Sequence, residues 1–348
     1  MGEPSGPEGH TGVVRKRLLA GAMLLVLVAS GCTDADTEQP ARPAKERPTP
    51  TATPTTPPPH PVSLPALMQR KYDGHGLTLR HELASTDEYR QHNVVYRSGK
   101  LRITGVLNVP RGPGPHPAVV LAHGHIDTDI YENGQGMRRE LDWLARRGFV
   151  TLHVDYRNHA GSDDDPDAEE NLRLGYTEDV INAVHALRDW DGPVDDEQVG
   201  LVGRSMGGGV IYNVLTVQPG LVDAAVVFAP VSSNTVDNFE RWIRNDSDRD
   251  GLAQRIIRRH GAPEKNPAFW RDVSSRSYFD RITEPILIHH GTSDDSCPIR
   301  WTRQTNEELE RVGADVTLRV YDGEQHAFGS QWPRAMKDTT RFLRRQLS

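Results

Sequence analysis

The feature that most constrains this chain is a regular alternation, between residues 118 and 346, of short apolar runs and longer stretches with helical periodicity. The apolar runs are continuous, which is typical of parallel strands buried on both faces of a sheet. This alternation predicts an α/β fold with a mostly parallel central sheet and helices on both faces. The expected strands are 118–122, 150–154, 199–202, 224–228, 286–289 and 316–320, and the expected helices are 138–147, 177–190, 206–217, 300–311 and 333–346.

Two segments depart from this alternation. Residues 94–96 and 101–109 flank Ser98-Gly99, which indicates a β-hairpin and an antiparallel start to the sheet. Residues 232–280 carry helical stretches with no clear strand, which indicates a small helical insert or cap. Its apolar side chains either line an acyl or side-chain pocket or only dock the insert onto the domain, and both interpretations stay open. These side chains are Phe239, Trp242, Ile243, Ile256, Ile257, Phe269 and Trp270.

The first 31 residues have the composition of a secretion signal. Three basic residues, 15–17, precede an apolar run of 13 residues that is too short to span a bilayer. The Ala-Ser-Gly that follows, together with Cys32, resembles a bacterial lipoprotein signal, although that pattern prefers Leu where Ala29 stands. The resemblance implies that residues 1–31 are removed and that lipid on Cys32 anchors the protein to the outer face of a bacterial cytoplasmic membrane. The alternative is a cysteine that merely follows a signal peptide.

Residues 32–65 are expected to form a proline- and threonine-rich tether, because ten of the 25 prolines fall between residues 40 and 65. This composition favours an extended chain with no core to bury, and its simplest role is to hold a domain away from a membrane. A proline motif for a protein partner is the alternative. Residues 66–348 remain for one folded domain, which is long enough for a sizeable core.

Composition excludes several classes of protein. The formal net charge of −7 gives no reason to expect nucleic acid or an anionic membrane surface as a partner. Two cysteines cannot build a disulfide framework or a four-thiolate zinc site. Cys297 is therefore expected to be a buried, unpaired small residue.

A candidate nucleophile stands in the sequence Gly203-Arg204-Ser205-Met206-Gly207, which directly follows an expected strand and directly precedes an expected helix. In a nucleophile elbow the turn is so tight that the flanking side chains must be small, and the serine hydroxyl projects above the sheet. The five-residue pattern is weak by itself, and its place between strand and helix makes it specific. Ser205 is therefore predicted to be the nucleophile of a hydrolase.

A serine nucleophile needs a base, and the base needs an orienting acid. In this architecture the acid and then the histidine follow the serine along the chain, each in a loop after a strand. Asp294 follows the expected strand 286–289, and His326 follows the expected strand 316–320. Asp294 is thus the predicted acid and His326 the predicted base, with Asp295 as the competing acid.

Two N–H groups are needed to stabilise an oxyanion. The backbone N–H of Met206, next after the nucleophile, is one candidate. The backbone N–H of His125 is the other, because His123-Gly124-His125 follows the strand 118–122 and glycine allows close approach. Two histidines with no third ligand nearby do not make a zinc site, so no metal and no cofactor are expected. Asp246-Ser-Asp-Arg-Asp-Gly251 copies half of a calcium loop, but Ile257 stands where a bidentate acid is needed, so a solvated turn is the simpler interpretation.

Together these motifs resemble the α/β-hydrolase fold, and most closely the catalytic domain of the prolyl oligopeptidase family and its dienelactone-hydrolase-like relatives. The resemblance rests on the His-Gly at 123–124, the serine motif, the segment 290–298 and Gly-Glu-Gln-His326-Ala-Phe, and it covers roughly residues 90–345. It implies that the first aspartate of Asp294-Asp295 is the triad acid. It also implies a serine hydrolase that cleaves an ester or an amide or peptide bond through an acyl-enzyme.

Two departures from the family pattern bear on the substrate. Prolyl oligopeptidases carry a β-propeller before the hydrolase domain, whereas here a proline-rich stretch separates the signal from the first expected strand. They also use a tyrosine hydroxyl from the early loop, where this chain has His125 beside the glycine. A carboxylesterase acting on a small-molecule ester is therefore an alternative to a peptidase acting on a short peptide. A non-catalytic surface binding protein is a further alternative, although such proteins usually lose a triad member. The sequence leaves the substrate and the oligomeric state open.

Overall fold

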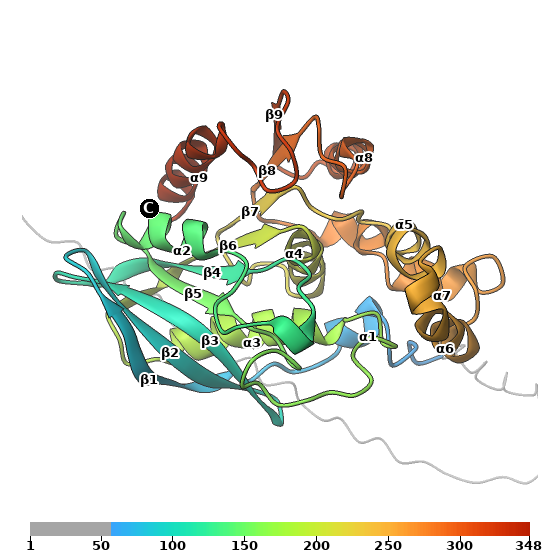
Figure 1. Ribbon diagram of the computed structural model, residues 1–348, viewed down its shortest axis with the longest axis horizontal. Helices are drawn as coiled ribbons and strands as arrows, with labels where there is room; N and C mark the ends of the chain where they lie inside the picture. Colours follow the sequence, from blue (N-terminus) through green and yellow to red (C-terminus); the bar gives the residue numbers. More distant parts are fainter. Residues whose placement is uncertain (1–56) are drawn as a thin grey trace, which may run out of the picture. The chain divides into compact units, whose positions relative to one another are not determined.

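A computed structural model describes residues 57–348 of the chain. These residues form a nine-stranded sheet with the order β1-β2-β3-β5-β4-β6-β7-β8-β9 (Figure 1). The strands β1, β2, β3 and β5 pair antiparallel, and the strands from β5 through β4 to β9 pair parallel. The mostly parallel sheet with an antiparallel N-terminal part is thus confirmed. The strands are β1 (His75–Ser85), β2 (Tyr89–Ser98), β3 (Leu101–Pro110), β4 (His116–Ala122), β5 (Val150–Val154), β6 (Val194–Arg204), β7 (Ala224–Phe228), β8 (Ile286–Gly291) and β9 (Val316–Tyr321).

Helices cover both faces of the sheet. Along β4, Val120 belongs to one buried apolar cluster and its neighbours Val119 and Leu121 to a second, as expected for a strand buried on both faces. Helices α2 (Arg138–Ala145) and α9 (Trp332–Gln346) contribute to the second cluster. The first cluster includes residues of α1 (Leu64–Met68), α3 (Gly175–Arg188), α4 (Met206–Val217) and α8 (Ile299–Arg311). The predicted helices of the domain are confirmed to within about two residues at their ends, which is the usual uncertainty of helix boundaries.

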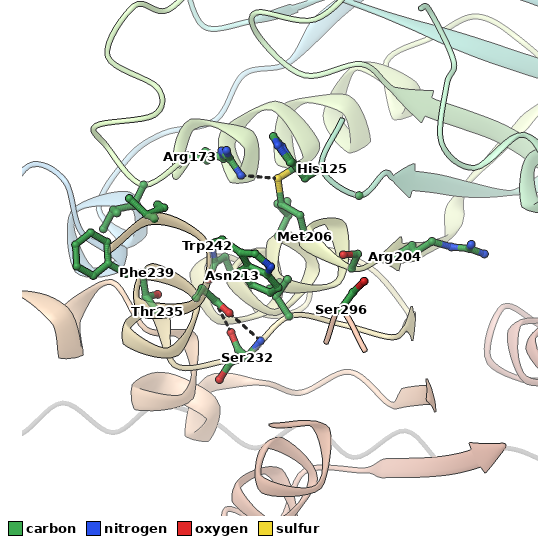
Figure 2. A pocket seen from close by; sticks show the side chains of 18 of the residues that line it. His125, Arg173, Arg204, Met206, Asn213, Ser232, Thr235, Phe239, Trp242 and Ser296 are labelled. Atoms are coloured by element: carbon green, nitrogen blue, oxygen red, sulfur yellow. Dashed lines mark hydrogen bonds between the residues drawn. The ribbon is translucent and has the colours of Figure 1, made fainter. Parts of the chain in front are cut away.

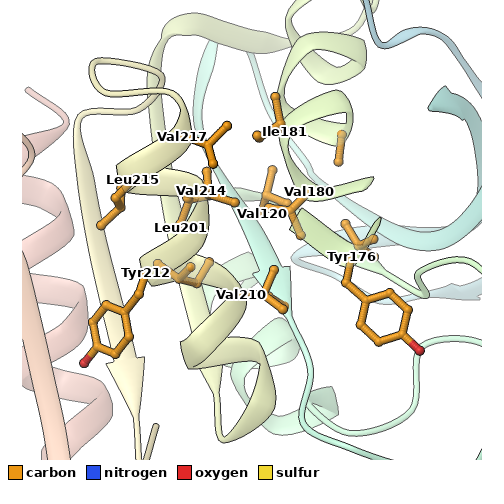
Figure 3. Close-up of a cluster of buried hydrophobic side chains, with 14 of the residues drawn as sticks. Val120, Tyr176, Val180, Ile181, Leu201, Val210, Tyr212, Val214, Leu215 and Val217 are labelled. Atoms are coloured by element: carbon orange, nitrogen blue, oxygen red, sulfur yellow. The ribbon is translucent and has the colours of Figure 1, made fainter. Parts of the chain in front are cut away.

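The layer that carries the candidate nucleophile is packed by small and β-branched side chains. Figure 3 shows Val180 of α3 and Val210 and Val214 of α4 close to Val120 of β4 and Leu201 of β6. All five are buried. Because these side chains interdigitate, α4 is held firmly against the sheet, and its first turn has a defined place at the end of β6.

The N-terminal limit of the packed chain lies earlier than the expected domain start at residue 66. Ser63 caps α1 through its side chain, and Leu64 and Leu67 are buried in the core. The expected boundary therefore falls inside a packed helix. The signal segment, Cys32 and the tether up to residue 56 lie outside the described residues. Within residues 57–348, no helix is both long enough and apolar enough to cross a membrane.

The insert at 232–280 is helical, as expected, and Figure 1 shows its helices gathered beside α1. It consists of α5 (Thr235–Phe239), a π-helical turn η2 (Glu240–Arg244), η3 (Ser247–Arg249), α6 (Asp250–His260), α7 (Pro267–Asp272) and η4 (Ser275–Arg281). Phe269 stacks on His260 at 4.4 Å between ring centroids, and His60 packs edge-on against Phe269 at 5.0 Å. Aromatic packing therefore joins the insert to the start of the packed chain.

Candidate active site

Ser205 occupies a strained turn between β6 and α4. Its φ is 55° and its ψ is −120°, a conformation that a residue with a side chain adopts only where its surroundings enforce it. Its backbone N–H donates to Phe228 O at 2.9 Å, and its carbonyl accepts from Val231 N at 3.1 Å, so the end of β7 and the loop after it hold the turn. A Cβ on Gly207 would lie 1.9 Å from Ala122 O. The glycine is therefore required for the close approach of α4 to β4.

Asp294 lies in the loop between β8 and α8, with its carboxylate fully buried. Its Oδ2 accepts from His326 Nδ1 at 2.8 Å, and its Oδ1 accepts from the backbone N–H groups of Ser296 at 2.9 Å and Cys297 at 2.8 Å. Burial alone would raise the pKa of Asp294, but the hydrogen bonds from His290, His326 and Cys297 hold it well below its usual range. Of the two neighbouring aspartates, the structure thus brings Asp294 to His326 as an ionised acceptor, while Asp295 is exposed.

His326 lies in the loop after β9, and its side chain is 24% exposed, into the same cavity as Ser205. Two arginines donate to the backbone carbonyl of Ala327, the residue after His326. Arg139 lies 2.6 Å and Arg204 lies 3.3 Å from this oxygen. The guanidinium of Arg204 is itself paired with the buried Glu140. The buried carboxylate of Glu324 accepts from the backbone at the end of this loop. Sequence reasoning missed these supports because they join segments far apart in the chain.

Within residues 57–348, Ser205 Oγ makes one polar side-chain contact, with Cys297 Sγ at 3.9 Å. A hydrogen bond from Ser205 to His326 is not formed, although both side chains line the cavity. Such bonds commonly tighten only when substrate is bound. Burial raises the pKa of the Cys297 thiol to about 12, and the negative charge of Asp294 adds to the effect. Cys297 is buried and unpaired, as expected, and stays a neutral thiol beside the serine.

The loop after β4 lies directly beside the serine. A Cβ on Gly124 would be 3.2 Å from Ser205 Cβ, a tight contact that the glycine avoids. His125 and Met206, the residues predicted to supply oxyanion donors, both line the cavity. Figure 2 shows Arg173 next to Met206, and its Nη1 lies 3.5 Å from Met206 Sδ. The pKa of His125 is lowered to about 4 by desolvation in the cavity wall and by the charges of Arg173 and Arg249, so its ring is neutral.

His123 does not face the cavity. It is fully buried, stacks on Tyr131 at 4.8 Å and on His153 at 5.3 Å, and its Nδ1 lies 2.6 Å from Gly124 O. Burial holds the pKa of His123 well below its ordinary value, so it is a neutral structural support of the loop. Within the described part of the chain, no group of three or more His, Cys, Asp or Glu residues is arranged to hold a metal ion.

The cavity in front of Ser205 has a volume of about 600 Å³. The insert supplies an apolar part of its wall through Phe239, Trp242 and Ile243. Figure 2 shows Phe239 and Trp242 among the lining residues. Ile256, Phe269 and Trp270 are buried in the core, and Ile257 packs against it. The question left open by the sequence is thereby answered, because some of these residues line the cavity and others dock the insert. Charged groups also reach the wall, namely Glu169, Arg173, Arg204, Asp246 and Arg249.

Comparison with known proteins agrees with this architecture. The family model of the prolyl oligopeptidase family matches residues 135–348. The uncharacterized peptidase YtmA of Bacillus subtilis is 26% identical over 242 residues, which cover 69% of this chain and 87% of that protein. The chain spans less than a third of the length of the curated acyl-coenzyme A thioesterases and dipeptidyl peptidases that it also matches.

Solved structures show the same fold. The acylaminoacyl peptidase of Pyrococcus horikoshii aligns with a TM-score of 0.59 at 20% identity, over 75% of this chain and 42% of that one. An acetyl xylan esterase from Paenibacillus sp. R4 aligns with a TM-score of 0.60 at 20% identity, over 82% of this chain and 92% of that one. The α/β-hydrolase fold expected from the sequence is confirmed. Because the family model covers more than half of its length, the chain belongs to the prolyl oligopeptidase family of serine hydrolases.

Proposed function

We propose that this protein hydrolyses a carboxylic ester or a short amide or peptide bond through Ser205, His326 and Asp294. The observation that carries the proposal is the 2.8 Å hydrogen bond between His326 Nδ1 and Asp294 Oδ2, at the edge of the cavity that also contains Ser205. The bond leaves the opposite ring nitrogen, Nε2, to act as the base. The strained backbone of Ser205 places its hydroxyl at the end of the sheet, where the loops meet.

In the acylation half-reaction, His326 Nε2 takes the proton of Ser205 Oγ as the oxygen bonds to the substrate carbonyl carbon. Asp294 holds the imidazole in the required tautomer and stabilises the imidazolium that forms. The backbone N–H groups of Met206 and His125 donate to the oxyanion, and the N-terminus of α4 adds a favourable dipole. The tetrahedral intermediate then expels the alcohol or amine, which takes the proton from His326.

Deacylation repeats the same steps with water. His326 takes a proton from the water, whose oxygen bonds to the acyl carbon of the ester on Ser205. Collapse of this second intermediate releases the carboxylic acid, and the serine oxygen regains its proton from His326. The two half-reactions together consume one water molecule and need no cofactor.

A carboxylesterase of the dienelactone-hydrolase-like type, without peptidase activity, is the second candidate, and one observation favours it. The first tyrosine in the loop after Gly124 is Tyr131, and its hydroxyl donates to the buried Asp155 Oδ1 at 2.7 Å. This hydroxyl is engaged away from the cavity, so the oxyanion would be held by backbone N–H groups alone. A cavity of about 600 Å³ with apolar and polar walls suits a small acyl ester as well as a short peptide.

The decisive experiment removes the nucleophile. Ser205→Ala should lower p-nitrophenyl acetate hydrolysis by at least about 10³-fold and abolish labelling by a fluorophosphonate probe, while the circular dichroism spectrum stays unchanged. A folded Ser205→Ala protein that retained full activity would refute the proposal. Comparing p-nitrophenyl esters with dipeptide p-nitroanilides on the wild-type protein separates an esterase from a peptidase.

We also propose that the mature protein is held on the outer face of a bacterial cytoplasmic membrane by lipid on Cys32. The basic, apolar and small-residue order that precedes this cysteine supports the proposal. Cys32→Ser should move the protein from the membrane fraction to the soluble extracytoplasmic fraction without changing specific activity. Unchanged retention in the membrane fraction would contradict the lipid anchor.

A further inference from the structure

Beneath the acid loop lies a second histidine that the proposed reaction does not use. His290, in β8, is completely buried. Its Nε2 lies 2.8 Å from Cys297 O and 3.2 Å from Asp294 Oδ2, and its Nδ1 lies 2.7 Å from the hydroxyl of Thr302 in α8. The ring therefore bridges the strand, the acid loop and the helix that follows.

The partners of His290 determine where its proton resides. A backbone carbonyl and an ionised carboxylate can only accept, so Nε2 must carry a hydrogen. Nδ1 bonds the Thr302 hydroxyl, which can donate or accept and is itself buried. Both ring nitrogens are satisfied, and the ring has one orientation in which this is possible.

Four donor groups consequently surround the carboxylate of Asp294. Two backbone N–H groups bond Oδ1, and His326 Nδ1–H bonds Oδ2 at 2.8 Å. The single Nε2–H of His290 bonds Cys297 O at 2.8 Å and is shared with Oδ2, which lies 3.2 Å from this nitrogen. A buried carboxylate with fewer donors would be less firmly oriented and would keep an unsatisfied lone pair. The hydrogen bond to His290 also withdraws negative charge from the oxygen that faces His326.

We propose that His290 is a positioning residue of the reaction, whose Nε2–H orients Asp294 Oδ2 towards His326 and limits how strongly that carboxylate stabilises the imidazolium. The inference rests on the proposed triad and assigns to it a fourth member that never touches substrate. Thr302 supports it by holding the ring of His290 in this orientation.

Loss of His290 should change the reaction in two measurable ways. Asp294 loses orientation, so kcat falls, whereas KM for a small ester stays nearly constant because His290 does not line the cavity. Asp294 also keeps more negative charge for His326, so the acidic limb of the kcat/KM profile, which reports protonation of the base, moves to higher pH. Other charged or titratable groups contact the two loops or the cavity rather than Asp294 or His326 directly. They are Cys297, Asp295 and Arg241 at the acid loop, Arg139, Arg204 and Glu324 at the His326 loop, and His125 in the cavity wall.

The test uses His290→Leu and the milder Thr302→Val, assayed with p-nitrophenyl acetate from pH 5 to pH 9. We expect kcat of His290→Leu to fall roughly 10- to 100-fold. The acidic limb should move upward by on the order of 0.5–1 pH unit. His290→Gln, whose amide can donate from nearly the same place as Nε2, should recover part of both effects. Thr302→Val should move the acidic limb in the same direction by a smaller pH shift.

His289 provides a matched control from the same strand. It is equally buried, but its ring bonds Tyr321 OH at 2.9 Å and Thr339 Oγ1 at 3.0 Å on the opposite face. His289→Leu should lower the stability of the protein yet leave the acidic limb of the kcat/KM profile unmoved.

Other outcomes would contradict the inference or its basis. If folded His290→Leu keeps the wild-type acidic limb, or if His289→Leu shifts that limb equally, His290 has only a structural role. If His290→Leu does not fold, Thr302→Val decides, and an unmoved limb there overturns the inference. The Ser205→Ala result reports separately on the proposed function, since an active Ser205→Ala protein would refute the triad itself.

Discussion

Asp294 and Asp295 are adjacent and chemically identical, yet their surroundings give them different roles. Asp294 is buried, accepts from two backbone N–H groups and contacts His326, whereas Asp295 is exposed. Asp294→Asn should therefore lower kcat/KM for p-nitrophenyl acetate by roughly 10³–10⁴-fold, because an amide cannot hold the imidazole in the productive tautomer. Asp295→Asn should remain within about twofold of wild type. A steady-state comparison of the two purified variants at pH 8 decides the acid, and a larger loss for Asp295→Asn would reverse the assignment.

At the scale of elements, the strands and helices that could be predicted are those whose pattern is set by burial. The ends of β5, β7 and α4 coincide with the predicted bounds. Polar Asp155 and Gln218 directly follow β5 and α4, and Pro230 stands two residues after β7. β1 was not predicted, since nearly all of its side chains are exposed and burial therefore does not set its pattern. Its pairing with β2, along one edge of the sheet, is what makes it a strand.

In the candidate site, too, some residues could be predicted from the strand pattern and others could not. Ser205, Asp294 and His326 could be proposed because each follows a recognisable strand in the expected order. His290, Glu140 and Glu324 could not, because their importance comes from contacts that only tertiary packing creates. Glu140, for example, pairs with Arg204 across 64 residues of sequence. A single sequence carries no signal for such a pair.

Both ion pairs and buried aromatic side chains attach the insert to the rest of the domain. Arg255 pairs with Glu170 at 2.6 Å, and Arg259 with Asp167 at 3.1 Å, but such exposed pairs contribute about 0–1 kcal/mol each. The buried Phe269 and Trp270 contribute about 1.5–3 kcal/mol each by removal from water. Aromatic burial therefore dominates, and raising the salt concentration should loosen the insert only slightly.

For the molecule as a whole, the unusual feature is a set of buried histidines that burial keeps neutral. The pKa of each is lowered in the folded protein, with desolvation as the main cause, and that of His289 falls to about 3. In the unfolded chain each of these histidines binds a proton as the pH falls through about 6.5, whereas in the folded protein it stays unprotonated until a lower pH. Folding therefore releases protons below pH 6.5. The residues are His123, His153, His159 and His289.

The free energy of unfolding should consequently fall as the pH drops from 7 to 5, by up to about 2 kcal/mol for each fully buried histidine. Asp294, whose pKa is depressed, adds to this loss only at lower pH, where an unfolded aspartate begins to bind protons. Glu178 and Glu284 act in the opposite sense, because burial raises the pKa of each, so they offset part of the loss near pH 5. Urea unfolding at pH 8, 7, 6 and 5 measures the slope, and His289→Leu should flatten it by about one proton's contribution. Stability that stayed constant or rose between pH 7 and pH 5 would show that these histidines are not held neutral by the fold.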